Sequence, residues 1–335
     1  MRHPFRSLSA PLLGFVLLAG CARHEVSPTT PNEAATGALS SSEMATAKNG
    51  SANATTTAKK FLFDASHAET AGNADWVLDV NGGVVPRFPT PAQSGITSST
   101  PETYWTAALS SWGVALVKLG HSVENLPPGT PITYGNSANP QDLSNYAVFV
   151  VDEPNTLFTS SEKTAILRFV QAGGGLCMIS DHTISDRNND GYDSPAIWND
   201  LMSNNTVQAN PFGYRIALTN ISETTSNVLA SATNPVLRGS QGAVTQLKFS
   251  NGATLTKTAG SQAQPLIWRG SSTQGNTDIM CASSTFGTGR VFVITDSSPA
   301  DDGTGSPGNN VFPGWTEVPS HARLHLNASL WLAKL

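Results

Sequence analysis

The feature that most constrains this chain is an apolar run of four residues, Leu176–Ile179, which follows three glycines. A run this short is typical of a strand that is buried on both faces, as the strands of parallel sheets are. The run ends abruptly in Ser180, Asp181 and His182. Open α/β sheets place their sites at the carboxyl ends of such strands. We therefore predict a central parallel strand that ends in functional polar residues.

Strand-like and helix-like segments alternate along the chain after residue 59. Apolar runs predict strands at 60–64, 121–126, 147–151, 176–179, 266–268, 278–281 and 290–295. Helical periodicity and capping signals predict helices at 99–119, 159–172, 195–202 and 321–335. The alternation in the first half indicates an α/β fold with a mainly parallel sheet and right-handed crossovers. Residues 212–257 are less regular and more β-like, which predicts a β-rich insertion in the second half.

The amino terminus carries an export signal. Residues 1–20 combine a basic start with an apolar core too short to span a bilayer, which is typical of a signal peptide. The core ends in Leu18–Cys21, which resembles the lipobox of bacterial lipoproteins and implies cleavage before Cys21 and its lipidation. The alternative is an ordinary signal peptide with an incidental cysteine. Because Ala22 shows no inner-membrane retention signal, we expect an anchor in the outer membrane of a Gram-negative cell envelope.

Three regions follow from these patterns: the signal peptide (1–20), a lipidated cysteine with a disordered tether (21–59) and one α/β domain (60–335). The tether is rich in Ser, Thr, Ala and Asn and cannot bury enough apolar surface to fold. Only 13% of the residues are charged, the net charge is −5 and Lys and Arg form no cluster, so we expect no nucleic-acid partner. No phosphate-binding loop is present, so we expect no nucleotide cofactor.

Two cysteines remain if Cys21 carries lipid. Cys177 and Cys281 both lie inside apolar runs, and buried cysteine behaves mostly as a small hydrophobic residue. A disulfide between them stays open at this point, because the exported domain would fold in an oxidising compartment.

Polar groups follow four of the predicted strands: Asp64/His67/Glu69, Asp152/Glu153, Asp181/His182 and Asp296/Ser297/Ser298. In a parallel sheet these groups converge on one edge, where several carboxylates must share protons or be compensated by a cation. Histidine and carboxylate ligands suit Zn²⁺, Mn²⁺ or a similar divalent ion. We expect a metal bound by Asp64, Asp181 and His182, and a catalytic site made by Asp181, His182, His67, Glu69 and Asp296. The alternative is that these residues only cap turns and helices.

The loop that follows the central strand contains a second candidate metal site. Asp186, Asn188 and Asp190 alternate along the chain before Gly191, as in the first half of an EF-hand. The twelfth position is Ile197, where an EF-hand needs Glu, so we predict at most a different kind of calcium loop. The alternative is a polar loop of Asx-turns with an arginine–carboxylate contact.

Three segments, GGGLCMISDH, ATNPVLRG and FGTGRVFVITDSS, resemble the class I glutamine amidotransferase-like fold. The resemblance extends to trehalose-utilisation-like proteins and to a group of bacterial lipoproteins. It implies a flavodoxin-like sheet with helices on both faces over residues 60–335. Amidotransferases carry a nucleophilic cysteine just after the strand that here ends at Ile179, and a His–Glu pair late in the chain. Here Ser180–His182 stands at that turn and Cys177 lies inside the strand, so we do not expect amidotransferase activity.

Two functions remain in competition at this point, and a third possibility is a calcium-stabilised structural domain. The first is a lipid-anchored envelope protein with a hydrolase-like site, in which Asp181 is a metal ligand and His182 a general base. Its ligand would be an unknown small molecule or glycan. The second is a non-catalytic binding or scaffold module for carbohydrate or envelope components. For that module, Trp76, Trp198 and Trp315 near predicted loops would supply stacking surfaces.

Overall fold

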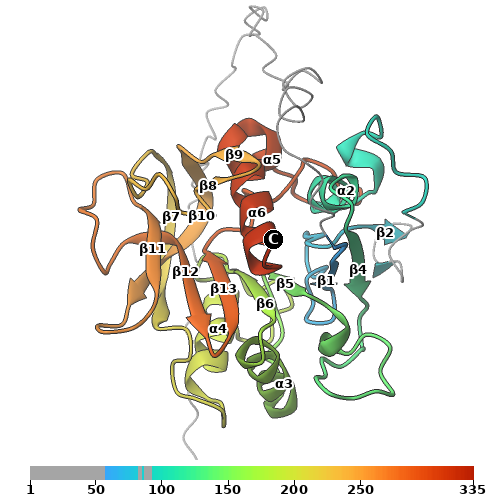
Figure 1. The fold of residues 1–335 in the computed structure, drawn as a ribbon, viewed down its shortest axis with the longest axis horizontal. Helices are drawn as coiled ribbons and strands as arrows, with labels where there is room; N and C mark the ends of the chain where they lie inside the picture. Colours follow the sequence, from blue (N-terminus) through green and yellow to red (C-terminus); the bar gives the residue numbers. More distant parts are fainter. Residues whose placement is uncertain (1–56, 82–84, 87–92) are drawn as a thin grey trace, which may run out of the picture. The chain divides into compact units, whose positions relative to one another are not determined.

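The computed structural model describes residues 57–81, 85–86 and 93–335, which belong to one compact unit, Asn53–Leu335. The predicted signal peptide, Cys21 and nearly all of the tether lie outside the described residues. A nine-stranded mixed sheet crosses the unit in the order β4-β1-β5-β6-β13-β12-β10-β7, with β11 paired to β12 (Figure 1).

Five neighbouring strands of this sheet are parallel. They are β1 (Lys60–Asp64), β4 (Ser122–Leu126), β5 (Val148–Asp152), β6 (Gly175–Ile179) and β13 (Gly289–Ile294). Numbered by their order in the chain, they lie in the order 2-1-3-4-5, which is the flavodoxin-like order. The predicted α/β class and its parallel strands are therefore confirmed.

Helices cover both faces of the parallel strands. Their bounds are α2 (Ser110–Lys118), α3 (Ser160–Gln171), α4 (Ser194–Ser203), α5 (Gly314–Glu317) and α6 (Pro319–Leu332). Short 3₁₀ turns lie at Glu102–Tyr104 and Leu143–Asn145. The predicted capping box that opens α3 is present, because Thr159 and Glu162 each accept from the other's backbone N–H.

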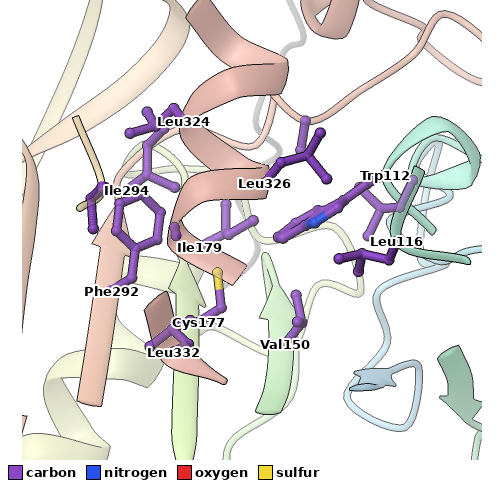
Figure 2. Close-up of a cluster of buried hydrophobic side chains, with 14 of the residues drawn as sticks. Trp112, Leu116, Val150, Cys177, Ile179, Phe292, Ile294, Leu324, Leu326 and Leu332 are labelled. Atoms are coloured by element: carbon purple, nitrogen blue, oxygen red, sulfur yellow. The ribbon is translucent and has the colours of Figure 1, made fainter. Parts of the chain in front are cut away.

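Alternating residues of each strand supply two hydrophobic cores, because successive side chains point to opposite faces of a sheet. On one face, Val150, Cys177 and Ile179 pack with Trp112 of α2 and with Leu324 and neighbouring residues of α6 (Figure 2). On the other face, the intervening residues, such as Phe149 and Met178, pack beneath α3 and α4. This double cover explains why the parallel strands are continuous apolar runs in the sequence.

The second half adds antiparallel strands to the β13 side of the sheet. They are β7 (Tyr214–Thr225), β10 (Leu247–Lys257), β11 (Gln264–Trp268) and β12 (Ile279–Phe286). Two-residue strands form the small pairs β2 (Val80–Asn81) with β3 (Val85–Pro86), and β8 (Arg238–Gly239) with β9 (Gly242–Ala243). Strands β7, β8, β9 and β10 lie within residues 212–257, where a β-rich insertion is predicted.

The predicted single helix over 99–119 is wrong in its first half, because α2 begins only at Ser110. The backbone N–H groups of Ala108 and Leu109 donate to the carbonyl oxygens of Asp75 and Val77, both at 3.1 Å. The loop after β1 therefore uses the amides that a longer helix would need. A tertiary contact has overridden the local helical pattern.

The two described cysteines are free and buried. Strand β13 lies between β6, which carries Cys177, and β12, which carries Cys281. Two strand spacings amount to about 10 Å, which exceeds the reach of a disulfide. Among the described residues, no helix is both long enough and apolar enough to cross a bilayer.

Candidate functional site

The carboxyl ends of the parallel strands gather carboxyl groups that are almost completely buried. They are Asp64, Glu69, Asp152, Glu153, Asp181, Asp296 and Asp301. Two basic side chains, His67 and Arg187, lie among them. The acids form two groups on neighbouring loops. The Asp64 group is built around Asp64 and Glu69, and the Glu153 group contains Asp152, Glu153, Asp181, Asp296 and Asp301.

The Asp64 group contains Asp64, His67, Glu69 and Glu162. His67 Nδ1 lies 2.7 Å from Asp64 Oδ2, and His67 Nε2 lies 3.5 Å from Glu162 Oε2. The backbone N–H of His67 donates to Glu69 Oε2 at 2.8 Å. The three residues Asp64, His67 and Glu69 each offer a ligand atom, and these atoms lie within 4.8 Å of one another. In the described part of the chain, no other set of His, Cys, Asp and Glu meets that criterion.

Electrostatics in the Asp64 group leave the Glu69 carboxyl only partly compensated. Burial lowers the pKa of His67, but the adjacent carboxylates of Asp64 and Glu162 outweigh burial and hold that pKa well above its usual value. Burial and the charge of Asp64 raise the pKa of Glu69 well above its usual range. Glu69 Oε1 is fully buried and has no hydrogen-bond partner. Such an oxygen needs a proton or a cation.

The Glu153 group is organised by Arg187. Its Nε donates to Glu153 Oε1 at 2.5 Å, one terminal nitrogen donates to Asn73 Oδ1 at 2.9 Å, and the other lies 3.4 Å from Asp181 Oδ2. Ser297, at the end of β13, donates its hydroxyl to Glu153 Oε2 at 2.9 Å. One guanidinium therefore binds side chains that follow β1, β5 and β6.

Glu153 has a backbone conformation that is rare for a residue other than glycine, with φ of +49°. Its N–H donates to the carbonyl oxygen of Ile179 at 3.1 Å, which ties the end of β5 to the end of β6. Left-handed non-glycine residues cost free energy and cluster at functional sites. The strained turn positions the Glu153 carboxylate between Arg187 and Ser297.

The remaining acids of the Glu153 group have raised pKa values. Burial, with the charges of Glu153 and Asp296, raises the pKa of Asp181 well above its usual value. Burial raises the pKa of Asp296 to about 7, although it accepts hydrogen bonds from the backbone N–H groups of Ser250 and Ser298. Burial and three neighbouring acids also raise the pKa of Asp152, and neither of its carboxyl oxygens has a partner. Burial therefore favours the protonated forms of Asp152, Asp181 and Asp296.

Asn155 and Asn73 join the two groups. The backbone N–H of Asn155 donates to the carbonyl oxygen of His67 at 2.7 Å, and Asn155 Oδ1 accepts from the backbone N–H of Arg187 at 3.0 Å. Asn73, from the loop after β1, binds the guanidinium of Arg187 directly. The four strand-end groups named from the sequence therefore meet at one edge of the sheet.

His182 lies at the outer rim of this edge and is partly exposed. Its Nε2 lies 3.7 Å from Asp181 Oδ2, and its Nδ1 lies beside the Thr183 carbonyl oxygen and 3.2 Å from Asn220 Nδ2. The structure places Asp181 and His182 in the Glu153 group, apart from the three ligand-forming residues at the end of β1. Their predicted role as metal ligands stays a prediction.

In the loop of 186–193, the side chains of the predicted calcium ligands make hydrogen bonds within the loop and with Asn155, and their role as calcium ligands stays a prediction. Asp186 accepts from the backbone N–H groups of Asp190 and Gly191, at 3.0 and 2.8 Å, and Asp190 accepts from that of Tyr192 at 3.0 Å. Asn188 donates its side-chain amide to Asn155 O and to Asp190. These contacts match the Asx-turn alternative, and the arginine–carboxylate contact is that of Arg187 with Glu153.

Sequence reasoning missed Arg187, Asn73, Asn155 and Glu162 as members of the site. Glu162 was visible only as part of a capping box, and Arg187 only through the arginine–carboxylate contact expected in the polar loop. The expectation of stacking surfaces was wrong, because Trp76, Trp198 and Trp315 are each at most 2% exposed and belong to hydrophobic cores. Large aromatic residues near loops are more often core residues than ligand platforms.

The strand order places the domain in the flavodoxin-like class of α/β folds. Comparison with protein-family models found no match, and comparison with curated proteins found none. Among solved structures, the mmIFT52 N-terminal domain is 13% identical with a TM-score of 0.46, covering 71% of this chain and 96% of that one. A cytoplasmic protein from Salmonella typhimurium is 14% identical with a TM-score of 0.44, covering 82% and 98%.

A ThuA-like protein from Bacteroides uniformis is 11% identical with a TM-score of 0.42, covering 85% of this chain and 94% of that one. At these scores the likenesses identify no family and no activity. The fold assignment rests on the order and direction of the strands in this chain.

Proposed function

We propose that this chain is a lipid-anchored protein of the cell envelope whose α/β domain carries a hydrolase-like, metal-supported site at the carboxyl ends of its parallel strands. The lipobox-like Leu18–Cys21 and the polar tether support the anchor. The convergence of the Asp64 and Glu153 groups supports the place of the site.

One observation carries the metal: Glu69 Oε1 is buried without a partner beside Asp64 and His67. Two buried carboxyl groups in contact repel each other unless a proton or a cation lies between them. Metal binding would displace a proton from His67, and one neutral imidazole nitrogen with two carboxylates is a ligand set that suits Zn²⁺ or Mn²⁺ better than Ca²⁺. Such an ion lowers the pKa of a bound water and polarises a carbonyl or phosphoryl oxygen.

The metal content of the purified full chain tests this proposal. We expect about one Zn²⁺ or Mn²⁺ per chain after dialysis against micromolar ion, and loss of the ion in Glu69→Gln. Glu317→Gln is the matched control, because Glu317 pairs with Lys248 on the surface, and it should keep the ion. An ion present at 100 times its Kd should stabilise the fold by about 2.7 kcal/mol. If the wild-type chain binds neither ion, the metal-supported site is refuted.

Catalysis is tested separately from metal binding. His182 is the partly exposed titratable group beside Asp181, so we propose it as the general base. His182→Ala should keep the ion proposed at Asp64, His67 and Glu69, and should lose turnover in a screen of ester, amide, phosphoester and glycoside substrates. Turnover that is unchanged in His182→Ala would contradict this role.

The burial of the acids favours a second function, a non-catalytic binding module. Asp64, Glu69 and Glu153 are at most 1% exposed, so they shape the edge of the sheet without reaching solvent. For such a module, we expect no turnover of any substrate class and saturable binding to an envelope glycan. Glycan-array binding together with a silent hydrolase screen would select this alternative.

A further inference from the structure

A cavity of about 330 Å³ lies at the opposite edge of the sheet, near the amino ends of the strands. Its walls come from the carboxyl-terminal ends of α2 and α6, the segment before β4 and the turn between β8 and β9. The apolar part of the lining is Leu119, Pro235, Leu330, Trp331 and Leu335. A volume of this size is at the lower end of the range for small-molecule sites.

The wall formed by the β8–β9 turn is closely packed against Asn327 of α6. Asn327 of α6 accepts from the backbone N–H of Gln241 at 3.0 Å and donates to the carbonyl oxygens of Val236 and Gly242, at 3.2 and 2.9 Å. A Cβ at Gly239 would lie 2.3 Å from Asn327 Oδ1, so only glycine permits this contact. The polar groups of Asn327 are therefore used in holding the wall.

His121 lines the cavity and can donate a hydrogen bond. It is 7% exposed, and its Nδ1 accepts from the backbone N–H of Lys59 at 3.4 Å. A neutral imidazole that accepts at Nδ1 carries its hydrogen on Nε2. No hydrogen bond joins Nε2 to any described residue. Burial and the neighbouring charge of Lys59 lower the pKa of His121, which keeps the ring neutral at pH 7.

We propose that this cavity binds a small molecule with an apolar body and one hydrogen-bond-accepting oxygen, of the class of medium-chain carboxylic acids and their amides. The apolar body packs against Leu330 and Trp331, and the oxygen accepts from His121 Nε2–H. Lys59 lines the second cavity, but its positive charge acts on His121, so a carboxylate is expected to bind more tightly than the amide. The cavity and the proposed metal site lie at opposite edges of the sheet, so either can fail without the other.

Titration calorimetry with octanoate and octanamide on the purified full chain tests the proposal. We expect saturable binding of both, with octanoate tighter. His121→Phe keeps an aromatic ring and removes the N–H, and it should weaken both ligands roughly tenfold, as expected for one lost hydrogen bond. Gln241→Trp, which fills the cavity from the turn, should abolish binding. Tyr134→Phe, in a separate cavity of about 260 Å³, is the matched control and should leave both affinities unchanged.

Absence of binding by both compounds overturns the proposal, as does unchanged affinity in Gln241→Trp. If His121→Phe fails to fold, as judged by its thermal unfolding, the outcome for Gln241→Trp decides. If His121→Phe weakens the binding of octanoate and octanamide equally, the result supports hydrogen bonding from His121 to the oxygen that both compounds carry. A loss confined to octanoate supports a carboxylate ligand, in which case Lys59→Met should produce the same loss. Unchanged affinity of both compounds in a folded His121→Phe refutes His121 as the donor.

Discussion

Arg187 shows how much of this site depends on one residue. Its guanidinium contacts Glu153, Asp181 and Asn73, which lie 34, 6 and 114 residues away in the chain. A planar fork of N–H donors can satisfy three acceptors at once, which a lysine ammonium does less well. Without the Arg187 cation, the buried carboxylates of Glu153 and Asp181 would have no neighbouring positive charge. The loop of 186–193 therefore points the Arg187 side chain toward these acids.

His325 is a second residue with a defined energetic role. Its Nδ1–H donates to the His321 carbonyl oxygen at 2.8 Å, while Nε2 is buried without a partner beside Trp112. Burial lowers the pKa of His325 to about 4. Protonation of Nε2 would therefore place a positive charge, and an N–H with no acceptor, inside the core between α2 and α6.

The sign of the resulting pH dependence follows from linkage. Between pH 6.5 and about 4, the unfolded chain binds a proton at His325 that the folded chain does not, so the free energy of unfolding falls as the pH falls. From pH 7 to pH 5, we expect His325 to account for a loss of about 2 kcal/mol. Urea unfolding at both pH values should show a smaller loss in His325→Phe. An equal loss in both proteins would contradict this assignment.

At the scale of elements, helix α3 connects the capping box to the site. Thr159 and Glu162 close the helix amino terminus, and the same Glu162 carboxylate lies 3.5 Å from His67 Nε2. Burial opposes ionisation of Glu162, but hydrogen bonds from His67 and Thr159 lower its pKa to about 2. A local helix signal thus also fixes one side of the Asp64 group.

Thr159→Ala should lower the free energy of unfolding by about 1 kcal/mol, the usual cost of a lost amino-terminal cap. Ser160→Ala is the matched control, because Ser160 is exposed at the first helical position and caps nothing in α3. The two midpoints of urea unfolding provide the measurement. A midpoint for Thr159→Ala that equals that of Ser160→Ala would show that the capping box contributes nothing to stability.

At the scale of the whole molecule, the two edges of the sheet differ in chemistry. The carboxyl edge holds the buried acids, whereas the amino edge holds the apolar cavity and the start of β1 at Lys60. The chain enters the domain at the amino edge. If Cys21 is lipidated, its tether therefore joins the domain at the edge opposite the candidate site.

Replacement of Cys21 tests the anchor. Cys21→Ser should move the protein from the membrane fraction to the soluble fraction, because the acyl chains that hold it in the bilayer would be missing. Cys281→Ser changes a buried cysteine of β12 and should leave the protein in the membrane fraction. Fractionation followed by mass measurement of the amino-terminal peptide checks both. A membrane-bound Cys21→Ser protein would argue against a lipid anchor at this position.

The sequence by itself determined the parallel strands, the capping box of α3 and the edge of the sheet where polar residues gather. Each of these depends on a local pattern, such as the apolar run of Leu176–Ile179 or the spacing of Thr159 and Glu162. It missed the start of α2, because the loop after β1 takes the amides of Ala108 and Leu109. It also missed that Trp76, Trp198 and Trp315 are buried.

Only the tertiary structure decided the membership of the site. The Arg187 contacts with Glu153 and Asn73, and the contact of Glu162 with His67, join residues that are 34, 114 and 95 positions apart in the sequence. No periodicity or capping pattern in the sequence predicts contacts between residues so far apart in the chain, because such contacts depend on strand order and on the paths of loops. The physical reason is that buried charges select their partners by proximity in the folded state, where burial makes an uncompensated charge costly.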